Sequence, residues 1–144
     1  MKDVKKYELK KNPTDFPRVQ ITCSNDAADF IKRFYCDDIG IFESFFVLML
    51  DQSNHTIGFA KISQGGVSAT VVDTRIVAKF AIDSLASGII LAHNHPSGNL
   101  KPSTADEKIT DKIKSGLAYF DIQVLDHIIV TEDGYTSFSD SGRL

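Results

Sequence analysis

The sequence predicts a single α/β (α+β) domain with a mixed central β-sheet flanked by helices, and two observations carry this prediction. Continuous apolar runs at 45–50 and 89–92 indicate strands that are buried on both faces. Segments with apolar residues at helical spacing follow each run, so strands and helices alternate along the chain. A chain of 144 residues with 42% hydrophobic and 24% charged residues is long enough for one core, and its composition is that of a globular protein.

The first half of the chain predicts a helix and a hairpin. A brief strand is expected at 19–21, followed by a helix for which Ser24 or Asn25 is the N-cap. The run at 45–50 is expected to be a central strand, and 56–63 is expected to return beside it after a tight turn.

A second helix and a second buried strand follow. Asp73 or Thr74 can cap the helix, which carries an apolar stripe, and Gly88 is expected to end it. The run at 89–92 then leads directly into two histidines.

The last part of the chain predicts one more helix and a final hairpin. Ser103 is expected to open the helix, and 122–125 and 128–130 are typical of further strand. The segment 132–134 fits a tight turn, after which 135–138 pairs back.

The charge distribution divides the chain into an N-terminal basic segment, 1–17, and a domain, 18–144. Five of the first eleven residues are lysines: Lys2, Lys5, Lys6, Lys10 and Lys11. They can form a basic arm, or they can belong to a solubilised tail or edge strand, since Lys on edge strands blocks unwanted pairing. The net charge of −3 argues against a protein that grips duplex DNA, because such proteins usually carry a basic surface.

The sequence contains no signal of export or of membrane insertion. The N-terminus lacks the apolar core of a secretory signal, and the longest apolar run, 45–50, is too short to cross a bilayer. We therefore predict a cytoplasmic protein without membrane association. Cys23 and Cys36 are expected to be reduced rather than joined in a disulfide.

The segment from His93 to Asp106 carries the residues that are most informative about chemistry. On an extended chain His93 and His95 project to the same side, which makes them a pair of candidate zinc ligands. A turn and Ser103 follow, and Asp106 adds a carboxylate from the first turn of the next helix. Catalytic zinc uses three protein ligands and keeps the fourth position open for water.

Each part of this segment also has a purely structural interpretation. Ser103 and Asp106 fit a capping box, which stabilises a helix by about 1 kcal/mol and has no catalytic role. Histidines at the end of a strand can simply be hydrogen-bonded or exposed. The metal hypothesis gains weight because the three residues are expected to converge on one point.

The order His93-x-His95, seven residues, Ser103, two residues and Asp106 resembles the JAMM motif of the JAB/MPN+ metallohydrolases. The longer string HNHPSGNLKPSTAD, followed by LDHIIV at 125–130, is similar to the RadC family of that superfamily. The strand at 46–51 and the loop at 64–66 also lie where that family has them. The resemblance covers about 19–138 and implies a JAB/MPN-like (cytidine deaminase-like) fold.

The resemblance implies roles for the site residues. His93, His95 and Asp106 would hold Zn2+, and Glu43, which matches the upstream glutamate of the motif, would be the general base. Ser103 would donate a hydrogen bond to the oxyanion of an amide substrate, either a peptide or an isopeptide. Without the resemblance, the favoured interpretation of Glu43 is a solvent-exposed acid at the start of a strand.

Three other polar residues have a mainly structural interpretation. His127 is expected to be a hydrogen-bonded structural histidine, with a position near the metal as the alternative. His55 is expected to be solvated in a hairpin turn. Asn94 is expected to point away from the metal ligands and to brace the loop.

The chain also departs from the family pattern. Full-length RadC proteins carry a helix-hairpin-helix region ahead of the metal domain, and the residues before Glu43 contain no such pattern, so we expect a short form. Three hypotheses remain: a zinc metallohydrolase acting on a peptide or protein, a nucleic-acid-associated protein of DNA repair or of a mobile element, and a metal-binding domain without turnover. The sequence does not predict the oligomeric state. Iron, manganese or nickel can also occupy such a site.

Overall fold

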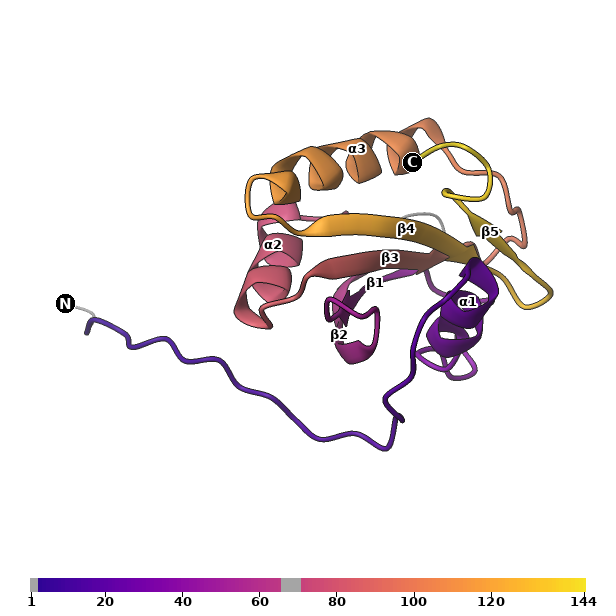
Figure 1. Cartoon of the computed structure of the whole chain (residues 1–144). Helices are drawn as coiled ribbons and strands as arrows, with labels where there is room; N and C mark the ends of the chain where they lie inside the picture. The colour runs from indigo at the N-terminus through magenta and orange to yellow at the C-terminus, as the bar shows by residue number, and fades with distance from the viewer. Residues whose placement is uncertain (1–2, 66–70) are drawn as a thin grey trace.

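In a computed structural model of the chain, which describes residues 3–65 and 71–144, three helices flank one mixed β-sheet of five strands (Figure 1). The helices are α1 (Ser24–Lys32), α2 (Thr74–Asp83) and α3 (Thr104–Ala118). The strands are β1 (Ser44–Leu50), β2 (Thr56–Gln64), β3 (Gly88–Asn94), β4 (Gln123–Val130) and β5 (Tyr135–Ser137). The predicted fold class is therefore confirmed.

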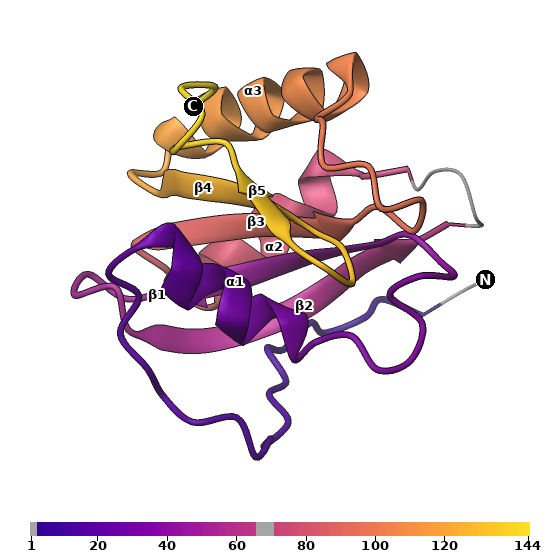
Figure 2. The same ribbon diagram turned by 90° about the vertical axis from the view of Figure 1, so that its right-hand side faces the viewer.

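The sheet has the order β2-β1-β3-β4-β5, and only β3 and β4 run parallel. Every residue of β1 and β3 is buried, as expected for central strands covered on both faces. α1 lies against one face, and α2 and α3 lie against the other (Figure 2). The parallel pair β3–β4 is connected through α3, as parallel neighbours require.

Side chains of β1 alternate between two apolar clusters. Phe46, Leu48 and Leu50 pack on the α1 face. Phe45, Val47 and Met49 pack on the face covered by α2 and α3. A continuous apolar run is needed here because both faces of the strand are covered.

The prediction of the first helix was correct in type but wrong at its start. Its N-cap is Cys23, which makes no capping hydrogen bond through its side chain, so neither Ser24 nor Asn25 is the cap. Asp26 instead accepts hydrogen bonds from the N–H (2.9 Å) and Oγ1 (2.6 Å) of Thr22. The carboxylate in the first turn therefore ties the incoming chain to the helix.

The prediction that Gly88 ends the second helix was wrong. α2 is followed by Ser84 as C-cap, and Leu85 takes the left-handed conformation with φ of 55°. Gly88 instead begins β3, where a Cβ atom would lie 2.9 Å from Cδ1 of Leu125. Any larger residue at this position would require the side chain of Leu125 to shift. Asp73 does cap the helix, because its side chain accepts from the N–H of Arg75.

Two expected strands also differ in extent. The strands expected at 122–125 and 128–130 form one strand, β4, which begins at Gln123 and continues through Asp126 and His127, because both of these residues pair with β3. At 19–21 only an isolated bridge forms, between Gln20 and His55. The pairing cannot continue toward the N-terminus in the same way, since Pro17 has no N–H to donate.

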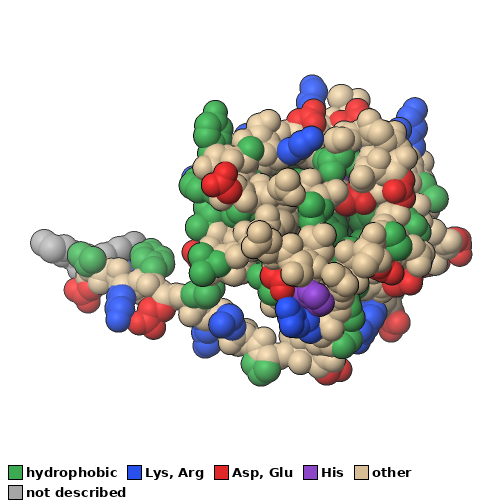
Figure 3. Space-filling view, viewed as in Figure 1, with side chains coloured by type: hydrophobic (Ala, Val, Ile, Leu, Met, Phe, Trp, Pro, Cys, Tyr) green, Lys and Arg blue, Asp and Glu red, His purple; other side chains and the backbone are tan. Residues whose placement is uncertain are grey.

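Residues 3–15 are in neither helix nor strand, and most of their side chains are exposed. Basic, acidic and apolar side chains all appear along this extended segment, which stands away from the domain (Figure 3). Phe16 is the point at which the chain joins the core, with its ring 4.8 Å from that of Phe59. Cys23 and Cys36 are both exposed, and neither is in a disulfide here. Within the described ranges, no helix is both long and apolar enough to cross a membrane. Gly66 of the predicted loop lies outside the described residues.

Candidate metal centre

The histidines of the motif lie where β3 ends. His93 is buried on the face of the sheet that α3 covers, and His95 follows the strand directly. Asp106 lies in the first turn of α3, and its carboxylate is 3.3 Å from Nε2 of each histidine. The three side chains that the sequence proposed as ligands therefore converge.

The distances among these donor atoms suit a small tetrahedral cation. Nε2 of His93 lies 3.0 Å from Nε2 of His95, and each nitrogen lies 3.3 Å from an oxygen of Asp106. Ligands about 2.0–2.1 Å from a tetrahedral zinc ion are separated by about 3.3 Å. The donor set of two imidazoles and a carboxylate also fits zinc chemically.

The hydrogen bond of His95 determines which ring nitrogen carries its proton. Nδ1 of His95 lies 2.6 Å from the carbonyl oxygen of Asn99. Because a carbonyl can only accept, Nδ1 must be the donor. In the neutral ring, Nε2 then presents its lone pair to His93 and Asp106.

A buried chain of hydrogen bonds places the proton of His93 on Nδ1 as well, which leaves the lone pair on Nε2. Thr110 donates its hydroxyl proton to the carbonyl of Asp106 (2.7 Å), so its oxygen accepts from Nδ1 of His127 at 2.6 Å. Burial lowers the pKa of His127 well below its usual value, and the ring is neutral. Its Nε2 must therefore accept from Nδ1 of His93, at 2.7 Å.

It follows that His93 and His95 direct two lone pairs at each other beside a carboxylate. Such an arrangement is repulsive unless a cation lies among the three groups. In the metal-free protein a proton on Nε2 of His95 can fill this role, since its hydrogen bond to the carboxylate of Asp106 raises the pKa of His95. Burial by itself would raise the pKa of Asp106, but when the imidazoles carry a proton at Nε2, hydrogen bonds from His93 and His95 to the carboxylate outweigh burial and hold that pKa far below its usual range.

Glu43 lies next to this pair of histidines. It precedes β1, in which Phe45 pairs with His93. Glu43, His93 and His95 each offer a ligand atom, and these atoms all lie within 4.8 Å of one another. The structure thus brings Glu43 to the site, and Glu43, His93 and His95 form a group that can bind a metal ion.

Ser103 and Asp106 form the capping box that the sequence indicated. The hydroxyl of Ser103 accepts from the N–H of Asp106 (3.0 Å), and Asp106 accepts from the N–H of Ser103 (2.8 Å). The structural interpretation is therefore correct, and it is compatible with the metal hypothesis. As an acceptor, the hydroxyl keeps its own proton for another partner.

The surroundings of the two histidines outside the motif, His127 and His55, differ in part from those predicted. His127 is fully buried and structural, as expected, but it also contacts His93 and so belongs to the surroundings of the site. His55 was expected to be solvated, yet it is only partly exposed and its Nδ1 is buried. The reason is that His55 bridges to Gln20, which brings the chain before α1 over the hairpin.

Thr110 is a residue of the site that could not be recognised from the sequence. Its signal was weak, because a threonine within a helix, four residues after Asp106, has no distinctive pattern. Thr110 becomes significant only because its helix lies over β4, which places its hydroxyl beside His127.

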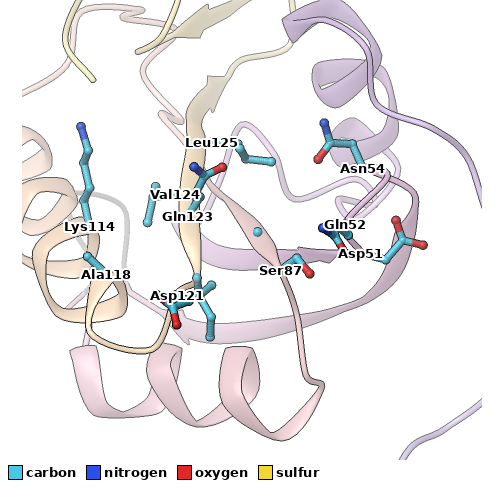
Figure 4. Close-up of a pocket in the computed structure, with 12 residues that line it drawn as sticks. Asp51, Gln52, Asn54, Ser87, Lys114, Ala118, Asp121, Gln123, Val124 and Leu125 are labelled. Carbon is cyan, nitrogen blue, oxygen red and sulfur yellow. The ribbon is translucent and has the colours of Figure 1, made fainter.

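A concave region lies at the end of the sheet opposite the histidines. This hollow of about 860 Å³ is formed where β3 and β4 begin, between the end of α3 and the turn after β1 (Figure 4). Lys114 and Asp121 lie on one side of it, and Asp51, Gln52 and Asn54 lie on the other. Among the described residues that line it, none is a histidine or a cysteine.

Comparison with known proteins identifies the family. A family profile described as "RadC-like JAB domain" matches residues 21–143, which is most of the chain. The chain belongs to the RadC-like JAB domain family. The resemblance found in the sequence is thereby confirmed, and the metal dependence of JAB domains agrees with the donor group described above.

Several RadC-like relatives bear the name UPF0758 protein. The one from Flavobacterium johnsoniae is 50% identical over 100 residues, which are 69% of this chain and 44% of the relative. The one from Porphyromonas gingivalis is 43% identical over 103 residues, or 71% and 45%. The one from Vibrio cholerae is 43% identical over 118 residues, or 81% and 74%. The chain thus spans about half the length of the first two relatives.

Proposed function

We propose that this RadC-like domain is a zinc-dependent hydrolase that cleaves an amide bond in a peptide or protein, either a peptide or an isopeptide bond. The observation that carries the proposal is the close approach of Nε2 of His93 and Nε2 of His95, 3.0 Å apart, beside the carboxylate of Asp106. Protein groups are arranged in this way where a cation is to be bound.

His93, His95 and Asp106 would hold the ion. Asp106 is preferred over Glu43 as the third ligand because its oxygens lie 3.3 Å from both imidazole nitrogens, as a tetrahedral site requires. A bound zinc ion with an open fourth position supplies Lewis acidity, which activates water and polarises a carbonyl group.

Glu43 would then be the general base. Its carboxylate lies within 4.8 Å of both imidazole donors, which is close enough to accept a proton from an attacking water molecule. The same carboxyl group can pass the proton to the leaving nitrogen, so that the amide bond breaks without releasing an amide anion.

Ser103 would stabilise the oxyanion. Its oxygen accepts from the N–H of Asp106, which orients the hydroxyl next to a ligand while its proton stays available. A donor in such a position typically contributes about 2.7–4 kcal/mol to the stability of the transition state.

The test joins metal analysis with activity measurements. The purified protein should contain about one zinc ion per chain, and His95→Ala should remove it. Glu43→Gln should keep the zinc and lose hydrolysis of a peptide and isopeptide library, whereas loss of zinc would make Glu43 a ligand. Hydrolysis of nucleic acid instead of peptides, by protein of the same preparation, would overturn the proposed substrate class.

Association with DNA, or with proteins of DNA repair, stays a prediction of the family resemblance. A gel-shift series with duplex DNA measures it. Tight binding that persists at about 200 mM salt would contradict our expectation from the net charge of −3, because electrostatic binding weakens steeply with salt.

A further inference from the structure

Asn94 lies between the two histidines but faces the other side of the sheet. Its neighbours His93 and His95 point toward α3, so the alternation of an extended strand turns Asn94 toward the α1 side. The side chain is fully buried, with 0% exposure. A buried amide of this kind must find hydrogen-bond partners, and these partners show what it does.

All the partners of the Asn94 amide are backbone groups of one segment, 39–44. Oδ1 accepts from the N–H of Ser44 at 2.8 Å. Nδ2 donates to the carbonyls of Ile39 and Phe42, each at 2.7 Å. The orientation of the amide follows from these partners, since the N–H can only donate and the two carbonyls can only accept.

The register of the sheet explains why a side chain is needed here. β1 pairs with β3 from Leu50↔Gly88 to Phe45↔His93, and the next pair in this register would be Ser44 with Asn94. The ladder between β1 and β3 instead ends at Phe45↔His93, while β3 continues beside β4, where the N–H of His95 bonds to the carbonyl of Val130 at 3.1 Å. The amide of Asn94 therefore replaces the missing backbone partner of Ser44.

These bonds hold the peptide groups on both sides of Glu43. The carbonyl of Phe42 and the N–H of Ser44, which flank Glu43, both bond to Asn94. The carbonyl of Glu43 itself accepts from the N–H of Gly65 at 2.8 Å. With both peptide planes held, the backbone torsions of Glu43 cannot rotate freely, and the direction in which its side chain leaves the backbone is determined.

We infer that Asn94 is a positioning residue for Glu43, which sets the place of the carboxylate relative to His93 and His95. The inference rests on the proposed function, in which Glu43 is the general base. Three consecutive residues, 93–95, then have two tasks: the outer two bind the cation, and the middle one holds the segment that carries the base. Because residues 93–95 both bind the cation and hold the segment that carries Glu43, the distance from the base to the cation is set within this short stretch of backbone.

The chemical requirement is specific to asparagine. An aspartate of nearly the same shape would direct a negative oxygen at the two carbonyls of Ile39 and Phe42, which need donors. Asn94→Asp should therefore release or displace Glu43 while leaving the imidazoles of His93 and His95 in place. Asn94→Ala removes the three bonds without adding a charge, and it is the second variant if Asn94→Asp does not fold.

The first measurement is hydrolysis by the zinc-loaded proteins, per folded chain, of the amide substrate found for the wild type. We expect Asn94→Asp to lower kcat about 100-fold, as for a displacement of about 1 Å, with KM and zinc content unchanged. Any residual rate that the Glu43→Gln protein keeps should not fall further when the same substitution is added, since Asn94 acts through Glu43. A wild-type kcat, or an equal slowing in both backgrounds, would overturn the inference.

The second measurement does not need activity. Crystal structures of wild type and Asn94→Asp give the distance from the Glu43 carboxylate to the ring nitrogens of His93 and His95. A displaced carboxylate in the variant supports the inference, and one that stays within 4.8 Å of both nitrogens overturns it. If the wild type binds no zinc or hydrolyses no amide, the proposed function fails, and these structures still decide the role of Asn94.

The matched control is Asn54→Asp, in the turn between β1 and β2. It makes the same chemical change at the opposite end of β1. Aspartate tolerates the positive φ of 61° found there. This control should retain wild-type kcat, zinc content and Glu43 position.

Discussion

Thr110→Val tests the hydrogen-bond chain that directs the lone pair of His93 at the metal. Valine has nearly the shape of threonine but cannot accept the proton on Nδ1 of His127, which lies 2.6 Å from the hydroxyl oxygen. Thr110 is 1% exposed, so water cannot easily replace the hydroxyl. In the metal-free variant His127 can move its proton to Nε2, and His93 then carries its own proton on Nε2, beside Asp106.

Zinc binding reverses this change, because it needs the lone pair of His93 at Nε2. His127 must then place an N–H against the methyl group of valine. An unsatisfied buried donor costs about 1–3 kcal/mol, which corresponds to zinc binding that is about 5- to 150-fold weaker. This range agrees with the effects of removing a group that orients a metal ligand, about 10- to 100-fold.

The assay is competition for zinc with a fluorescent chelator at pH 7. The control is Thr56→Val, because Thr56 is also buried, and its Oγ1 accepts a hydrogen bond from the N–H of Val19, far from the histidines. Thr56→Val should lower the thermal stability and leave the Kd for zinc unchanged. If Thr110→Val lowers the stability in the same way and keeps the wild-type Kd, the chain from Thr110 to His93 does not orient the ligand.

Three further predictions concern the same region and the core. Ser103→Ala should destabilise the protein by about 1 kcal/mol, measured by urea unfolding, because the helix loses its N-cap. It should also slow hydrolysis about 100-fold or more if the hydroxyl donates to the oxyanion. An unchanged rate would mean that Ser103 only caps the helix. In the metal-free protein, the raised pKa of His95 contributes stability that is complete below about pH 6.5 and is lost as the pH rises through the folded-state pKa. The lowered pKa of Asp106 contributes stability that is present above about pH 4. The Tm of the metal-free protein should therefore fall as the pH is raised from about 6 to 8, and a flat profile would contradict the ion pair. Gly88→Ala should lower the free energy of unfolding by about 1–3 kcal/mol, because the new Cβ would lie 2.9 Å from Leu125; wild-type stability would mean that Leu125 moves aside freely.

The zinc-loaded protein should respond to pH in the opposite way. Metal binding needs deprotonated imidazoles, so the increase in Tm that zinc produces should grow as the pH rises through the pKa of His95. Thermal scans with and without zinc, at the same set of pH values, measure this difference. An increase that does not change with pH would argue that His95 is not a ligand.

Much of the fold could be predicted because the pattern of apolar residues reflects burial directly. The runs at 45–50 and 89–92 are continuous, and they became the central strands β1 and β3. Element ends were harder, since they depend on single hydrogen bonds. After α2 and its C-cap Ser84, the left-handed position is taken by Leu85, so no glycine marks the end of this helix.

The order of residues along the chain by itself determined which side chains are candidates for the metal centre. His93 and His95 share a face by the period of a strand, and Asp106 and Ser103 are placed together by the first turn of a helix. Such local geometry needs no knowledge of the rest of the fold.

Only the tertiary structure decided how these groups are oriented. The proton positions on His93 and His95 depend on Thr110, His127 and a backbone carbonyl, and the place of Glu43 depends on the amide of Asn94. These partners come from separate elements that meet only when the sheet and α3 have packed. Hydrogen bonds act over about 3 Å, so distance along the chain says little about them.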